Sequence, residues 1–132
     1  MKIIDKLALL HIKDRKVLFV RSRGKDTFYT VGGKREAGET DEQALTREVK
    51  EEINVDLIPT TIKYLTTFED RAHGKEDEIL VKLTCYTANF NGVIIPASEI
   101  EELVWLDTKT VMKTTPTGRL VIDWLNKNGL VD

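Results

Sequence analysis

The sequence is poor in cysteine and contains no long apolar run. Its only cysteine is Cys85, which excludes an intrachain disulfide and favours a reducing compartment. The apolar run near the N-terminus is short and is broken by Asp5 and Lys6, and no small-residue cleavage site follows it. These features exclude a membrane span and a secretory signal in this segment. We therefore expect a cytoplasmic protein that does not enter a membrane.

The charge is nearly balanced and lacks a basic stripe. The 132 residues carry 20 basic and 22 acidic side chains, which are well mixed along the chain. This pattern argues against a surface that coats nucleic acid, and it permits a metal cation and, through it, an anionic substrate. With 41% hydrophobic residues the chain should bury a real core, which excludes disorder. No repeat or linker interrupts it, so we predict one domain over residues 1–132.

Alternating apolar residues predict a series of short strands. We expect a hairpin of 7–12 and 16–22 around a polar turn, and a second hairpin at Asn91-Gly92. The predicted strands are 7–12, 16–22, 28–31, 57–68, 79–90, 93–95 and 102–107. A closing helix is predicted over 118–128. This order of elements indicates an α+β fold in which a mixed sheet lies between helices on opposite faces.

The strongest helix signal covers residues 40–53. Thr40 and Gln43 have the spacing of a capping box, and Asn54 suits the left-handed conformation that ends a helix. Apolar residues recur every four positions and form a stripe that should face the core. These residues are Leu45, Val49 and Ile53.

Three glutamates, Glu48, Glu51 and Glu52, crowd the C-terminal end of this helix beside the apolar stripe. Like charges at this spacing oppose the helix by about 0.2–0.5 kcal/mol per pair, and negative charge near a C-terminus opposes the dipole. Arg47 can pair with Glu51 at the i,i+4 spacing and Lys50 is nearby, but neither is expected to point into the arc of the three carboxylates. A divalent cation such as Mg²⁺ or Mn²⁺ would reverse the sign of each repulsion. By itself, however, the spacing is more typical of an acidic face in water.

The residues around these glutamates form a longer pattern. Gly33 is followed after five residues by Glu39 and after seven more by Arg47-Glu48-Val49, and then by Glu51-Glu52 and Val55. This arrangement over 33–55 closely resembles the signature box of the Nudix hydrolases, G-x5-E-x7-R-E-U-x-E-E-x-G-U with U aliphatic. The one departure is Asn54, where the family has glycine, and asparagine is the next-best residue for a left-handed helix end.

The resemblance implies an α/β/α sandwich and a role for each residue of the box. Glu48, Glu51 and Glu52 would bind catalytic divalent cations, with Glu52 the firmest ligand and Glu48 either a ligand or the base that activates water. The Gly32 carbonyl would be a further ligand. Gly33 would shape the loop, and Glu39 and Arg47 would form an ion pair that ties the loop to the helix. The alternative for this pair is an ordinary surface ion pair.

Outside the box the sequence leaves several alternatives open. Many family members add a carboxylate from elsewhere, and clusters are present at 76–78 and at 99–102. We favour the second cluster, with Glu99 or Glu102 foremost, although solvated loops explain either cluster. Arg21 and Arg23 are candidates for binding substrate phosphates or for a charged surface loop.

The resemblance implies a Mg²⁺-dependent pyrophosphohydrolase, with Mn²⁺ as an alternative ion, that cleaves a diphosphate linkage in a nucleoside di- or triphosphate or a related derivative. Small-molecule nucleotides are favoured over RNA, and a homodimer stays open. One alternative is a Nudix-fold module that binds a nucleotide or ADP-ribose without turnover, and another is an acidic-helix domain with no ligand. The sequence does not identify the substrate.

Overall fold

The structure, a computed structural model, describes residues 2–71 and 79–132. Seven strands form the main sheet. Six of them follow the order β2-β3-β4-β1-β7-β6, and the seventh, β9, pairs with β3. These strands are β1 (Lys2–Leu9), β2 (Ile12–Lys13), β3 (Lys16–Ser22), β4 (Tyr29–Lys34), β6 (Lys63–Arg71), β7 (Ile79–Thr87) and β9 (Ile100–Leu106). A two-stranded sheet pairs β5 (Asp56–Leu57) with β8 (Phe90–Asn91).

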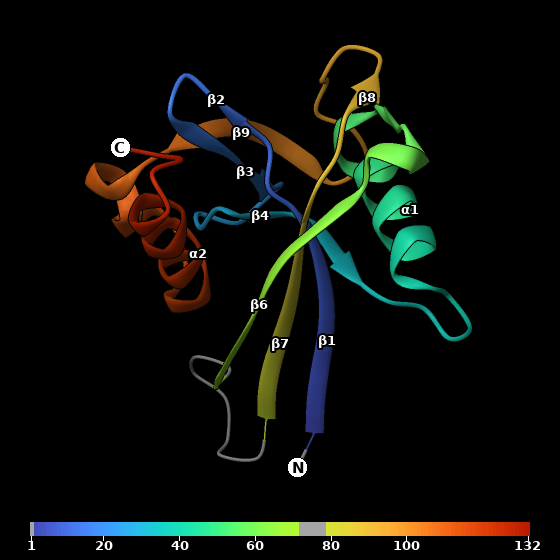
Figure 1. Cartoon of the computed structure of the whole chain (residues 1–132), viewed down its shortest axis with the longest axis horizontal. Coiled ribbons are helices and arrows are strands. Elements are labelled where there is room, and N and C mark those ends of the chain that lie inside the picture. Colours follow the sequence, from blue (N-terminus) through green and yellow to red (C-terminus); the bar gives the residue numbers. More distant parts are fainter. Residues whose placement is uncertain (1, 72–78) are drawn as a thin grey trace.

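The sheet is mixed, as predicted, because β1 runs parallel to β7 and antiparallel to β4. Helix α1 (Asp41–Ile53) and helix α2 (Pro116–Lys127) lie on opposite sides of it (Figure 1). The α+β architecture expected from the order of elements is therefore confirmed. Among the described residues, no helix is both long enough and apolar enough to cross a bilayer.

Each helix covers its own apolar cluster, and the alternation of side chains along β1 divides the two clusters. Leu7 and Leu9 belong to the cluster under α1, whereas Ala8 and Leu10 belong to the cluster under α2. Successive side chains of a strand point to opposite faces, so one strand can supply both cores. The central strand therefore places one row of side chains toward α1 and the other toward α2.

Several predicted elements are wrong in detail. The first strand begins at Lys2 and pairs with β4 and β7, and only the short β2 forms the expected hairpin with β3. The irregular strand region predicted over 57–68 contains a 3-10 turn at Pro59–Thr61, and β6 starts late, at Lys63, as Pro59 favours, because a proline ring cannot donate to a strand ladder. Residues 93–95 form a loop and no strand. A 3-10 segment, Thr108–Lys113, precedes α2 and was not predicted.

Candidate functional site

Helix α1 has the ends that its sequence predicts. The Thr40 side chain accepts a hydrogen bond from the Gln43 N–H, and the Gln43 side chain accepts one from the Thr40 N–H. At the other end, Asn54 adopts the left-handed conformation, with φ 59° and ψ 34°. Ile53 is therefore the last residue of the helix and Asn54 is its cap, which leaves Glu48, Glu51 and Glu52 on the last two turns.

The loop that follows β8 is bonded to the same end of α1. The Ile95 N–H donates to the Ile53 carbonyl at 3.1 Å, and the Ala97 N–H donates to the Glu52 carbonyl at 3.0 Å. These bonds satisfy carbonyls that a helix end leaves without intrahelical partners. Residues 95–97 are thereby fixed against the C-terminal turn of α1, and Glu99 follows two residues later.

Two glycines of β4 give the α1 carboxylates access to the sheet. A Cβ at Gly32, where φ is 137°, would lie 2.1 Å from the Leu7 carbonyl oxygen. A Cβ at Gly33 would lie 2.5 Å from Glu48 Oε2. The Glu48 carboxylate therefore occupies the space that a side chain at position 33 would fill. The paired glycines are needed for clearance at this point, in addition to any role in a turn.

Glu52 is the most perturbed acid of the site. Its Oε1 accepts a hydrogen bond from the Gly32 N–H at 2.8 Å. Burial raises the pKa of Glu52 to about 8, the neighbouring Glu48 and Glu51 contribute to the rise, and the Gly32 N–H opposes it. The contact made by Gly32 is thus through its N–H, whereas the sequence prediction concerned its carbonyl.

Arg47 connects the loop before α1 to the carboxylates. Its Nε and Nη2 donate to the two oxygens of Glu39 at 2.7 and 2.8 Å, so the predicted ion pair is present with the geometry of a bidentate fork. The hydrogen bond from Arg47 lowers the pKa of Glu39 to about 2. The expected i,i+4 pairing of Arg47 with Glu51 is present, since Nη1 reaches Glu51 Oε1 at 3.5 Å. Contrary to expectation, the same Nη1 also donates to Glu48 Oε1 at 2.9 Å, so Arg47 does point to the carboxylates.

The arrangement fits a cation, although no three acid, histidine or cysteine side chains in the described part of the chain form a ready cluster. One oxygen of Glu48 is bonded to Arg47 and one oxygen of Glu52 to Gly32. The other oxygen of each accepts no hydrogen bond from a described residue. Half-buried carboxylates without a full set of partners, next to like charges, are the donor set that a hard divalent cation stabilises.

A groove of about 810 Å³ lies beside Glu52 and extends to the N-terminal end of α2. Gly32 and Gly33 line it next to Glu52, and its apolar lining includes Ile4, Val81 and Leu83. Among the described residues, its charged lining consists of Glu52, Lys6, Arg71 and Arg119. Lys6 and Arg119 place positive charge in the groove with Glu52, which suits an anionic ligand. Sequence reasoning missed Lys6 as a site residue, and the available signal was a lysine between two apolar residues, Ile4 and Ala8, on one face of the strand.

The candidate site residues outside the box differ in the contacts that they make. Arg21 donates to Glu102 at 2.9 Å and to Glu101 at 2.8 Å, because β3 and β9 place Arg21 directly opposite Glu102. A candidate phosphate-binding residue and a candidate acid are thus partners. Glu99 has no side-chain partner among the described residues, and its carbonyl accepts from the Arg23 N–H at 2.7 Å. The cluster at 76–78 lies outside the described residues.

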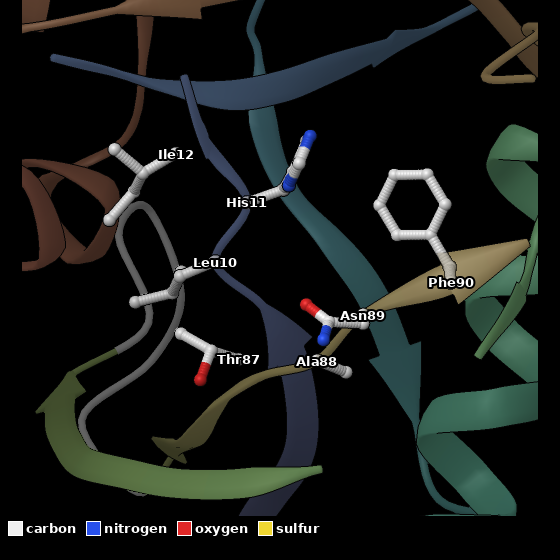
Figure 2. A pocket seen from close by; sticks show the side chains of 7 residues that line it. All are labelled: Leu10, His11, Ile12, Thr87, Ala88, Asn89 and Phe90. Atoms are coloured by element: carbon white, nitrogen blue, oxygen red, sulfur yellow. The ribbon is translucent and has the colours of Figure 1, made fainter. Parts of the chain in front are cut away.

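A second hollow, of about 490 Å³, lies away from the carboxylates, where the end of β1 and residues 87–90 meet. Figure 2 shows the residues around it, including the His11 and Phe90 rings, whose centroids are 5.0 Å apart. Burial lowers the pKa of His11. His11 is not among the described residues that line the groove beside Glu52.

Comparison with known proteins gives a family and a fold. The NUDIX domain model matches residues 6–125. The structure is similar to the Escherichia coli ORF135 protein, with 24% identity, a TM-score of 0.74 and coverage of 100% of this chain and 96% of that one. A MutT NUDIX hydrolase from Burkholderia pseudomallei gives 17% identity, a TM-score of 0.74 and coverage of 93% and 98%. The E. coli dihydroneopterin triphosphate pyrophosphohydrolase gives 22% identity and a TM-score of 0.70, with coverage of 97% of this chain and 99% of that one. No curated protein matches the sequence.

Proposed function

The chain belongs to the Nudix hydrolase family, and we propose that it cleaves a diphosphate linkage in a nucleoside di- or triphosphate or a related nucleotide derivative with the help of Mg²⁺. The observation that carries this proposal is the position of Glu52. This half-buried acid, whose pKa is raised to about 8 beside two further glutamates, lines a groove that Lys6 and Arg119 also line. A cation bound by the acids and a phosphate bound by the groove would together offset these charges.

Glu51 and Glu52 would hold the ion, with the Gly32 carbonyl as a further ligand, and of the two roles open to Glu48, ligand or base, we propose that of base. When bound, a divalent ion supplies neutralisation of phosphate charge and lowers the pKa of water. Mn²⁺ is compatible with the same oxygen donors. The chain contributes the positions of the acids, because Asn54 ends the helix behind them and Gly33 leaves the space that the Glu48 carboxylate occupies.

Hydrolysis joins a water oxygen to one phosphorus and breaks the bond from that phosphorus to the bridging oxygen. The bridging oxygen leaves on the other product, and the water proton passes to a carboxylate base. We assign the base to Glu48. Arg47 holds Glu48 Oε1, and Glu39 in turn holds Arg47, so the direction of Glu48 Oε2 is fixed from the loop. The role of the Glu39–Arg47 pair is therefore to position Glu48.

For the additional acid we propose Glu99 in preference to Glu102. The Glu102 carboxylate is bonded to Arg21, and both residues belong to the β3–β9 ladder. Glu99 follows the segment that is bonded to the last turn of α1 and has no side-chain partner among the described residues. The hydrogen bond between the Ala97 N–H and the Glu52 carbonyl therefore brings the loop that carries Glu99 to the end of α1, although the two segments are far apart in the sequence.

A hydrolysis screen over nucleoside di- and triphosphates, dinucleoside polyphosphates and nucleotide sugars, with Mg²⁺ and with EDTA, tests the proposal. We expect Mg²⁺-dependent release of phosphate or pyrophosphate and its loss in Glu52→Gln. Glu42→Gln is the matched control, since Glu42 is an exposed acid in the first turn of the same helix. A folded protein that binds nucleotides in a calorimeter but cleaves none of the panel would instead support a binding module.

A further inference from the structure

Lys6 is an unusual residue for the position that it occupies. It lies in β1 between Ile4 and Ala8, on the row of side chains that faces α2. Ala8 is fully buried and Ile4 lines the groove, so the two neighbours of Lys6 on this row are apolar. The Lys6 side chain is half-buried and lines the same groove as Glu52. A lysine is rarely placed on such a surface unless its charge has a partner.

No described carboxylate forms an ion pair with Lys6 within 4.0 Å. Glu52 and Glu48 attract its charge only through space, and Lys34, its direct neighbour across the β1–β4 ladder, repels it. The nearest identified contact of the ammonium is the Tyr29 ring, whose centroid is 5.9 Å from Nζ. Tyr29 also lines the groove and is 43% exposed. Lys6 thus lines the groove with no ion-pair partner among the described residues.

We propose that Lys6 binds a phosphate oxygen of the substrate's diphosphate and holds it against the carboxylates. This inference rests on the proposed function and assigns a phosphate-binding residue to the same groove. A diphosphate that enters between Lys6 and Glu52 brings to the ammonium the negative charge that the protein lacks there. The ammonium of lysine is a compact point charge with three donors, which suits a phosphate in several orientations.

Binding of imidodiphosphate, a diphosphate analogue with a nitrogen bridge, tests the role without turnover. Its affinity is measured by calorimetry at saturating Mg²⁺ for wild type, Lys6→Gln and Lys6→Arg. Because a hydrogen bond to a charged group contributes about 1.5–3 kcal/mol, Lys6→Gln should weaken binding by about 10- to 100-fold. Lys6→Arg keeps the charge and should recover part of the loss. Lys2→Gln makes the same change on an exposed residue of the same strand and should bind like wild type.

The outcomes separate this inference from the proposed function. If wild type binds the analogue and hydrolyses nucleotides but Lys6→Gln binds it equally well, Lys6 serves only to offset Glu48 and Glu52, and the inference is overturned alone. If wild type neither binds the analogue nor cleaves any nucleotide, both proposals fall. A thermal melt of each variant with Mg²⁺ alone shows whether the fold is retained. Affinity lost in a folded Lys6→Gln and partly recovered in Lys6→Arg supports the inference.

Discussion

Replacing Gly33 with alanine is a sharp test of the site, because the structure shows what the added methyl group would meet. The new Cβ would lie 2.5 Å from Glu48 Oε2 and 2.6 Å from the carboxyl carbon. Ordinary contact begins at 3.4 Å, so the carboxylate must retreat by about 0.9 Å, the difference between 3.4 and 2.5. The obstacle is the end of a flexible side chain, and Gly33 does not have a positive φ. We therefore expect Gly33→Ala to fold.

The effect on catalysis should be large. A misplacement of about 1 Å in a catalytic group can reduce the rate by about 100-fold. Displacement would also strain the contact between Glu48 Oε1 and Arg47, which is 2.9 Å long. We expect kcat to fall by about 100-fold while the midpoint of urea denaturation stays close to that of wild type.

A double-mutant cycle with Glu48→Gln identifies the cause of the loss. If Gly33→Ala acts by moving Glu48, the double variant should be little slower than the slower single variant, because both changes disable one group. Additive losses would show that the methyl group acts elsewhere. Wild-type activity in a folded Gly33→Ala would refute the assignment of Glu48 to the reacting centre.

Three further predictions concern neighbouring residues. Gly32→Ala should unfold the protein more easily, by about 3 kcal/mol or more in urea, since its Cβ meets the Leu7 backbone at a φ of 137°; a smaller loss would show that β4 can shift. In EDTA, stability should fall as pH rises from about 4.5 to about 8, by at most about 1.4 kcal/mol per pH unit, because the folded pKa of Glu52 is raised and the folded state keeps a proton that the unfolded state releases. In urea melts, Glu52→Gln should lose this pH dependence of stability. If wild type and Glu52→Gln show the same pH dependence, Glu52 is not its cause. Glu99→Gln should reduce kcat by about 10-fold or more and Glu102→Gln by less than about fivefold; the reverse order in the hydrolysis assay would move the additional acid to β9.

The parts of the site that the sequence predicted are those determined locally. The capping box, the left-handed Asn54 and the Glu39–Arg47 pair all lie within one short segment, where side-chain spacing translates directly into geometry. The main strands were recognised for the same reason, because alternation along one strand reports its buried face. The bounds of these strands differ from the predicted ones where pairing with a neighbouring strand, and not the strand's own sequence, determines how far the strand extends.

The parts that were missed depend on residues far apart in the chain. Lys6 became a groove residue only because β1 lies between β4 and β7, which one strand's sequence does not reveal. Arg21 and Glu102 were considered for separate tasks, yet the β3–β9 register makes them neighbours. Residues 93–95 were read as a strand from their apolar character, whereas Ile95 bonds to the end of α1. In each case tertiary pairing overrode local preference.

The distribution of countercharge among the three glutamates explains which of them should depend most on an ion. Arg47 bonds to Glu48 and reaches Glu51, and Glu51 is also half-exposed, so water and a guanidinium offset part of both charges. Glu52 receives one backbone N–H and lies closer to the groove. Because desolvation is the largest cause of its raised pKa, its negative charge is the one that the protein alone stabilises least. A divalent cation that displaces the proton from Glu52 therefore gains the most at this residue, and Mg²⁺ binding should release protons near neutral pH.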